Sequence, residues 1–214
     1  MAKRWCWAAC LLLTIVCLVA QAEVARCQDD LEQTVDRVCR RIPPENKARK
    51  LECRAVVIMS MDSHNDDSLK TALKMLKQAQ AIAPNDLSIL NNTAFCYVKQ
   101  KKYETALSIL ENSLSRQPDN LGVKNFTCML KERLGYPRSE YRACYHSVVQ
   151  AIKEKKMAKG INYVITVLVA DEPDAQAIRD QFIAAMDPKD KSAASWKKAL
   201  ENFNRDEYIR KHLP

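Results

Sequence analysis

Two segments of the chain, 34 residues apart, carry the same pattern of small, apolar and helix-ending residues. The later segment has Tyr103, Ala106, Leu107 and Leu110 at helical spacing, ahead of Pro118-Asp119-Asn120. Subtracting 34 gives the matching residues of the earlier segment, which are Leu69, Ala72, Leu73, Leu76 and Pro84-Asn85-Asp86. A fixed period of this length is typical of folds built from stacked, similar units, and it restricts the architecture more than any other feature of the sequence.

Each unit is predicted to be an antiparallel pair of helices joined by a tight turn. In the later unit the first helix has Leu90, Ala94 and Tyr97 on one apolar face, and Lys101-Lys102 mark the turn. A small residue such as Ala106 lets the two helices approach, because a bulky side chain there would be overpacked. A lone pair cannot bury its apolar stripe, so successive pairs are expected to stack.

This pattern resembles the tetratricopeptide repeat (TPR), with two repeats at about 53–120. The resemblance implies an all-α fold: a short right-handed solenoid of antiparallel helical hairpins, TPR-like, with extra N- and C-terminal helices. The predicted segments are a signal peptide at 1–22, an N-terminal helix and linker at 23–52, the repeats at 53–120, degenerate helical hairpins at 121–188 and a C-terminal capping helix at 189–214.

The chain contains only three glycines and eight prolines, and this low content of helix-breaking residues favours helix throughout. Outside the later repeat, helices are predicted at 29–41, 46–61, 69–83 with Ser68 as its cap, 123–134, 139–155, 161–170, 174–186 and 192–210. The β-branched run 161–170 is also compatible with a buried strand. A buried helix is preferred because no second strand candidate lies nearby.

The N-terminus has the features of a secretory signal peptide. Lys3 and Arg4 precede an uncharged run at 5–20, and Ala20-Gln21-Ala22 supplies a cleavage pattern of small residues. The run is shorter than a membrane-spanning helix needs. We therefore expect a protein that is secreted or in the endoplasmic reticulum lumen, or alternatively in an organelle reached through a cleaved N-terminal signal. No stable membrane insertion is expected after cleavage.

Six of the nine cysteines remain once Cys6, Cys10 and Cys17 leave with the signal. In an antiparallel helix pair, residues equally far from the turn lie level with each other. Cys128 and Cys144 are centred on residue 136 in a turn, and Cys39 and Cys53 on residue 46, so each pair is predicted to form a disulfide within one hairpin. Cys27 with Cys96 is the remaining pairing. The alternative is that some of these cysteines are buried thiols.

The resemblance implies that the first helix of each pair lines a concave groove for an extended peptide or a partner helix. The groove-facing, partner-binding positions are Arg54, Val57, Met61, Ser88, Asn91, Phe95, Val98, Asn125 and Met129. Phe95 and Met129 offer apolar contacts, and Asn91 and Asn125 offer amide hydrogen bonds. The alternative for each position is ordinary packing or solvent exposure.

Two N-glycosylation sequons, Asn91-Asn92-Thr93 and Asn125-Phe126-Thr127, are also 34 residues apart. In a secreted chain both asparagines are candidate glycan acceptors. By the repeat pattern both face the groove. A glycan there would hinder a peptide ligand and move binding to the convex face or the C-terminal helices.

No catalytic, metal or cofactor motif is present, and the carboxylate pairs fall at predicted helix ends or in loops, where capping explains them. The formal charge of +8 is spread along the chain, so nucleic acid is not an expected partner. The expected function is a non-catalytic protein–protein interaction module that binds another protein or peptide. The alternatives are a structural subunit of a larger assembly and, less favoured, a small helical enzyme or lipid carrier. The sequence does not fix the oligomeric state.

Overall fold

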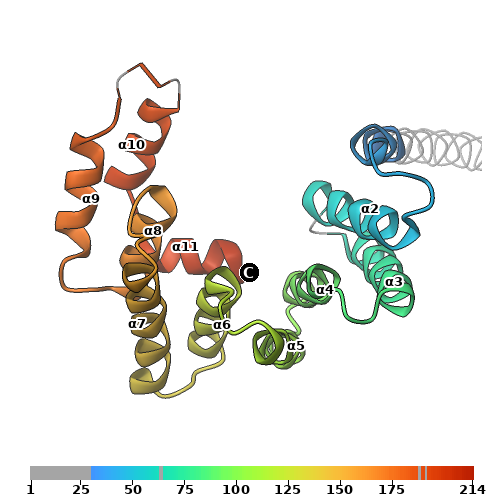
Figure 1. Cartoon of the computed structure of the whole chain (residues 1–214), viewed down its shortest axis with the longest axis horizontal. Helices are drawn as coiled ribbons and strands as arrows, with labels where there is room; N and C mark the ends of the chain where they lie inside the picture. The colour runs from blue at the N-terminus through green and yellow to red at the C-terminus, as the bar shows by residue number, and fades with distance from the viewer. Residues whose placement is uncertain (1–29, 63–64, 188, 191) are drawn as a thin grey trace, which may run out of the picture. The chain divides into compact units, whose positions relative to one another are not determined.

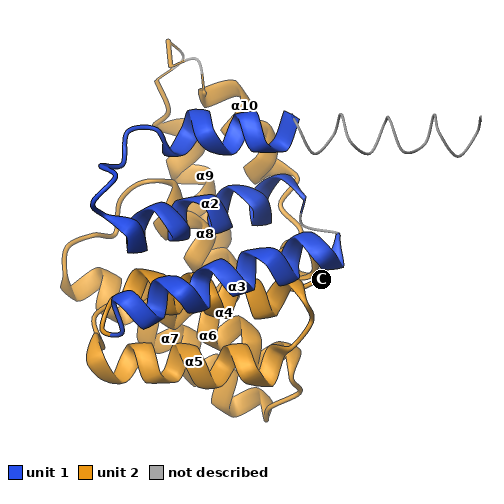
Figure 2. Cartoon of the chain, turned by 90° about the vertical axis from the view of Figure 1, so that its right-hand side faces the viewer, with its two compact units in different colours: residues 1–84 blue, residues 85–214 orange. Residues whose placement is uncertain are grey.

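The computed structural model describes residues 30–62, 65–187, 189–190 and 192–214. The predicted signal peptide at 1–22 and Cys27 lie outside these ranges. All regular secondary structure in the described ranges is helical (Figure 1), in agreement with the predicted all-α class. The chain divides between Pro84 and Asn85 into two compact units, coloured separately in Figure 2. This division falls inside the segment predicted to hold both repeats.

Unit 1 contains helical residues 30–39, α2 (Lys47–Met61) and α3 (Asp66–Ile82). Helix α3 begins three residues before the predicted start, because Asn65 and not Ser68 is its N-cap. The Asn65 side-chain oxygen accepts hydrogen bonds from the backbone N–H groups of Asp67 (3.0 Å) and Ser68 (3.3 Å). The Ser68 hydroxyl instead donates to Asp62 Oδ2 at 2.5 Å. Asparagine caps helices well, and Asp66 and Asp67 complement the positive helix end.

Helices α2 and α3 pack on each other, and both carry small side chains that are buried. Ala55, Ala72 and Ala79 are completely buried, as expected where two helices approach closely. Arg54 of α2 forms ion pairs with Glu32 and with Asp36 (2.7 Å to Oδ1) in the preceding helix. The contacts of Arg54 therefore lie within its own unit.

Unit 2 is a run of eight helices among the described residues: α4 (Leu87–Lys99), α5 (Tyr103–Arg116), α6 (Leu121–Arg133), α7 (Arg138–Glu154), α8 (Ile161–Ala170), α9 (Ala175–Ala184), α10 (Ala193–Glu201) and α11 (Arg205–His212). From α4 to α9 each helix packs on the next one in the chain. Asp86 caps α4 and Asn120 caps α6 through their side-chain oxygens. Each cap is the last residue of a Pro-containing triplet, 84–86 or 118–120, that the two segments share. The repeated pattern therefore also includes the residue that starts the next helix.

The run at 161–170 is helix α8, and the strand alternative is wrong. Every residue from Val167 to Ala170 is buried, as are Tyr163 and Val164. A helix satisfies its backbone hydrogen bonds within itself, whereas a lone strand in the interior would leave its N–H and C=O groups unpaired. None of the helices in the described ranges has both the length and the apolar character needed to cross a bilayer.

The C-terminal segment differs from its prediction as one helix over 192–210. It forms α10 and α11, separated at residues 202–204. Asn204 caps α11 by accepting a hydrogen bond from Glu207 N at 2.9 Å, which favours a new helix start there. The break brings Leu200, Ile209 and Leu213 into the core, while Trp196 on α10 is 42% exposed. The segment thus returns to the core instead of serving only as an end cap.

Candidate functional site

The first helices of two successive pairs, α4 and α6, lie side by side in unit 2. The rings of Phe95 on α4 and Phe126 on α6 meet edge to face, with centroids 4.8 Å apart. Asn91 and Asn125 occupy equivalent positions on the same two helices. Both residues are partly buried, and their Oδ1 atoms are buried without a hydrogen-bond partner among the described residues.

We define the inner surface as Ser88, Asn91 and Phe95 of α4 with Asn125 and Phe126 of α6. All of these residues except Phe126 were predicted to face a groove. The prediction came from the repeat period of 34 residues. Phe126 was not among the predicted groove residues, so its contact with Phe95 was missed. With Oδ1 buried, the amide NH2 group of each asparagine is the part of the side chain left to contact a ligand.

Three of the predicted partner-binding residues have little accessible surface. Val57 is 8%, Val98 1% and Met129 2% exposed, and Val98 and Met129 belong to the core of unit 2. These apolar side chains pack in the interior, so they are unsuited to contact a partner. Arg54 is ion-paired within unit 1, whereas Met61 (53%) and Ser88 are exposed.

The threonines of both sequons are buried within their helices. Thr93 and Thr127 are each 4% exposed, and their hydroxyl groups donate to the carbonyl oxygens of Ile89 (2.8 Å) and Val123 (3.0 Å). Glycosylation of Asn91 and Asn125 stays a prediction. Since the folded helices hide the threonine hydroxyls, attachment of a glycan would have to precede formation of α4 and α6.

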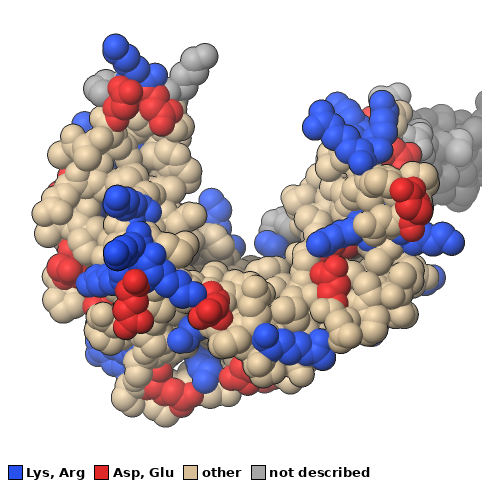
Figure 3. All heavy atoms as spheres, viewed as in Figure 1, with Lys and Arg blue, Asp and Glu red and all other residues tan. Residues whose placement is uncertain are grey.

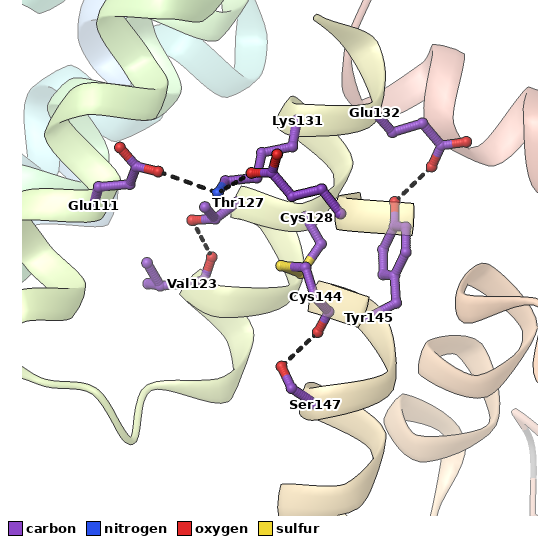
Figure 4. The surroundings of a disulfide bond; sticks show 10 residues. Glu111, Val123, Thr127, Cys128, Lys131, Glu132, Cys144, Tyr145 and Ser147 are labelled. Atoms are coloured by element: carbon purple, nitrogen blue, oxygen red, sulfur yellow. Dashed lines mark hydrogen bonds and ion pairs between the residues drawn. A yellow bond between two sulfur atoms is a disulfide. The ribbon is translucent and has the colours of Figure 1, made fainter. Parts of the chain in front are cut away.

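A polar network joins α11 to α6, α7 and α8. Arg205 donates from both terminal nitrogens to Glu132, at 2.8 Å to Oε1 and 2.7 Å to Oε2, and from Nε to the Val169 carbonyl oxygen at 2.7 Å. The Tyr145 hydroxyl donates to Glu132 Oε2 at 2.9 Å (Figure 4). Figure 1 shows α11 beside α6 and α8. Sequence reasoning missed this network, because Glu132 and Arg205 are 73 residues apart.

Burial and the neighbouring carboxylate of Glu132 raise the pKa of Tyr145. Burial works against the charge of Arg205, but its bonds to Glu132 outweigh this and raise the pKa of the guanidinium. At neutral pH Tyr145 therefore keeps its proton and Arg205 its charge. The network is suited to holding α11 in place and not to proton transfer.

Both predicted intra-hairpin disulfides are formed. Cys128 and Cys144 join α6 to α7 (Figure 4), with Cα atoms 5.6 Å apart. Cys39 and Cys53 join residues 30–39 to α2, with Cα atoms 5.9 Å apart. The pairing of Cys27 with Cys96 stays a prediction, since Cys27 lies outside the described residues. Cys96 is completely buried, and burial raises its pKa to about 11.

Within the described part of the chain, no three or more His, Cys, Asp and Glu side chains are grouped so that they could hold a metal ion. Residues 66–126 match the family model described as tetratricopeptide repeat. The matched segment contains α3, α4, α5 and the start of α6. Comparison with curated proteins and with solved structures finds no match for the chain in either.

Proposed function

Residues 66–126 form a tetratricopeptide-repeat segment, and from this premise we propose that the protein binds another protein, without catalysis, through the inner surface of α4 and α6. The family match is the observation that supports the proposal, because such repeats generally mediate protein–protein binding and are generally non-catalytic. The inner surface combines polar and aromatic side chains of this segment, of which Ser88 is exposed and the other four are partly buried.

The chemistry of the inner surface fits an extended peptide segment. Asn91 and Asn125 present amide donors at equivalent positions on neighbouring helices, and such donors bind the carbonyl oxygens of a peptide backbone. The Phe95–Phe126 pair supplies apolar area beside them. Towards the C-terminal end of α6, Glu132 is already bound by Arg205 of α11. The ligand is therefore expected on the N-terminal side of α6, where Asn125 and Phe126 lie.

We place the protein in an oxidising compartment, as a secreted or endoplasmic reticulum protein. The basic, apolar and small-residue order of residues 3–22 supports this address. The disulfides Cys39–Cys53 and Cys128–Cys144 support it as well, because such bonds are rare in reducing compartments.

The double variant N91D/N125D will lose the partner that the wild-type chain captures. Each aspartate replaces an amide donor by an anionic acceptor of the same shape, so a peptide carbonyl would be repelled at both positions. The mature chain, produced in a eukaryotic secretory host, serves as bait for affinity capture with quantitative mass spectrometry. We expect a recovery about tenfold lower than for wild type for the partner that uses the inner surface.

The matched control is T93V/T127V, which removes both sequons but keeps both asparagines. This variant is expected to retain the partner. Equal recovery of the partner by N91D/N125D and wild type would contradict the proposed surface. Loss of the partner by T93V/T127V alone would show that a glycan is recognised, and would contradict binding by the amides.

A second candidate, a subunit of a larger assembly, is favoured by one observation. On α9 only Ala175 is buried, while Ile178 and Phe182 are half-buried and Trp196 on α10 is exposed. Incompletely covered apolar side chains at the end of a helix stack suit permanent packing against another subunit. Light scattering on a size-exclusion column at micromolar concentration separates the two functions. The proposed function expects a monomer, and obligate association would favour the subunit.

A further inference from the structure

The turns α4–α5 (residues 100–102) and α6–α7 (residues 134–137) lie on one edge of unit 2. The guanidinium carbon of Arg133, at the end of α6, is 5.2 Å from the ring centroid of Tyr103, the first residue of α5. Successive hairpins packed in order place equivalent turns on the same side. Basic residues that are far apart in the sequence are thereby brought together.

We define the basic edge by five cationic residues in or directly next to these two turns: Lys99, Lys101, Lys102, Arg133 and Arg138. All except the half-buried Lys99 are exposed. In contrast, basic and acidic side chains lie next to each other at several places on the face shown in Figure 3.

None of the five residues of the basic edge is ion-paired within the described part of the chain. The nearby carboxylates are already engaged, because Glu132 binds Arg205 and Glu140 binds Lys131 at 3.1 Å. Glu104, in the first turn of α5, is the remaining acidic residue close to the two turns. The edge therefore keeps a net positive charge that the surrounding protein does not neutralise.

Local helix stability does not explain all of these cations. Lys99 and Arg133 stand at helix C-termini, where a positive charge is favourable. Lys102 is the N-cap of α5 and Arg138 is the first residue of α7, and neither helix has a side-chain cap. A cation at a helix N-terminus opposes the helix dipole. Two such placements in consecutive hairpins point to a requirement outside the fold.

We propose that the basic edge binds an acidic segment, rich in Asp and Glu, of the partner protein. The inference rests on the proposed function, which supplies a protein partner. Carboxylates pair with Lys and bidentately with Arg, and a charged edge accelerates encounter with an acidic chain.

Aromatic rings contact two of the five cations of this edge. Lys102 Nζ lies 5.9 Å from the Tyr97 ring centroid, and Arg133 lies over Tyr103. Such contacts restrict long side chains before the ligand arrives and lower the entropic cost of binding. Of the large side chains in the two turns, Tyr136 is 37% exposed. Leu134 packs against the core of unit 2. The two turns therefore present no exposed Trp, Phe or Leu of the kind that inserts into membranes.

The test uses the full mature chain and a fluorescently labelled oligoglutamate peptide, with binding measured by anisotropy at low and physiological salt. The edge variant K101Q/K102Q/R138Q is compared with K156Q/K159Q/K198Q. The control removes the same charge from exposed positions outside the two turns. The edge variant is expected to bind about tenfold more weakly than wild type, with a smaller salt dependence, and the control to bind like wild type. Circular dichroism and thermal melting verify that both variants are folded.

Equal weakening in the two variants would show that net charge alone attracts the peptide, and would overturn the inference. Tighter binding to phosphatidylserine-containing vesicles or to duplex DNA than to oligoglutamate would overturn it too. The captured partner separates this inference from the proposed function. If N91D/N125D loses the partner while the edge variant retains it, the proposed function stands and the basic edge is not its docking site.

Discussion

Replacement of Arg205 by alanine will lower the free energy of unfolding by about 3 kcal/mol, the lower end of the range for breaking a buried ion pair, because this pair is only partly buried. The side chains of Arg205 and Glu132 are only 23% and 19% exposed, so the remaining carboxylate would be left poorly solvated. The variant also removes the donor to the Val169 carbonyl, which holds the end of α8. Urea denaturation followed by circular dichroism measures the loss.

Two further variants on α11 test whether the loss of stability comes from the bonds between Arg205 and Glu132. Arg210→Ala removes an exposed cation from the same helix and is expected to change the free energy of unfolding by less than about 0.5 kcal/mol. Arg205→Lys keeps the charge but cannot form the paired bonds to Glu132, so it should fall between the alanine variant and wild type. If the two alanine variants had the same free energy of unfolding, α11 would be held by its apolar contacts alone.

The pH dependence follows from the raised pKa of Tyr145. A raised pKa in the folded state favours the protonated form, so this stabilisation is fully present below the unfolded value of about 10. It is lost as the pH rises through the higher folded value. Wild-type stability should therefore fall more steeply above pH ~10 than that of Tyr145→Phe, which has no proton to lose there.

Local patterns were sufficient to predict the helices of the repeats. The period of 34 residues places Ala72 and Ala106 in equivalent packed positions, and both are completely buried. The disulfides followed from another local rule, since Cys128 and Cys144 are equally distant from the turn between their helices. In both cases the information lies within one hairpin, where helix geometry fixes which residues meet.

Contacts between distant segments could not be predicted in this way. Arg205 reaches Glu132 across 73 residues, and no periodic pattern relates the two positions. Val98 and Met129 were predicted to face a groove because the repeat pattern specifies helix faces, whereas their burial depends on neighbouring helices in unit 2. The basic edge was missed for the same reason. Charge that is evenly spread along the sequence becomes concentrated only when consecutive turns stack.

Removal of the Cys128–Cys144 disulfide in C128S/C144S will also lower the free energy of unfolding by about 3 kcal/mol, the value expected for a loop of this length in the chain-entropy model. The sequence separation is 16 residues. Without the bond, the unfolded chain regains the conformational freedom of the α6–α7 turn. In addition, Cys128→Ser puts a polar hydroxyl into a site that is completely buried. Equilibrium urea denaturation without reductant measures the difference from wild type.

The second disulfide provides the matched control, because Cys39 and Cys53 close a loop of nearly equal length, 14 residues, in unit 1. Loop closure alone predicts a similar loss for C39S/C53S, but at a different place in the molecule. Hydrogen exchange should rise in α6 and α7 for C128S/C144S and in α2 for C39S/C53S. The expectation is that each disulfide stabilises the hairpin that it closes and not the chain as a whole. Increased exchange in the same helices for both variants would contradict it.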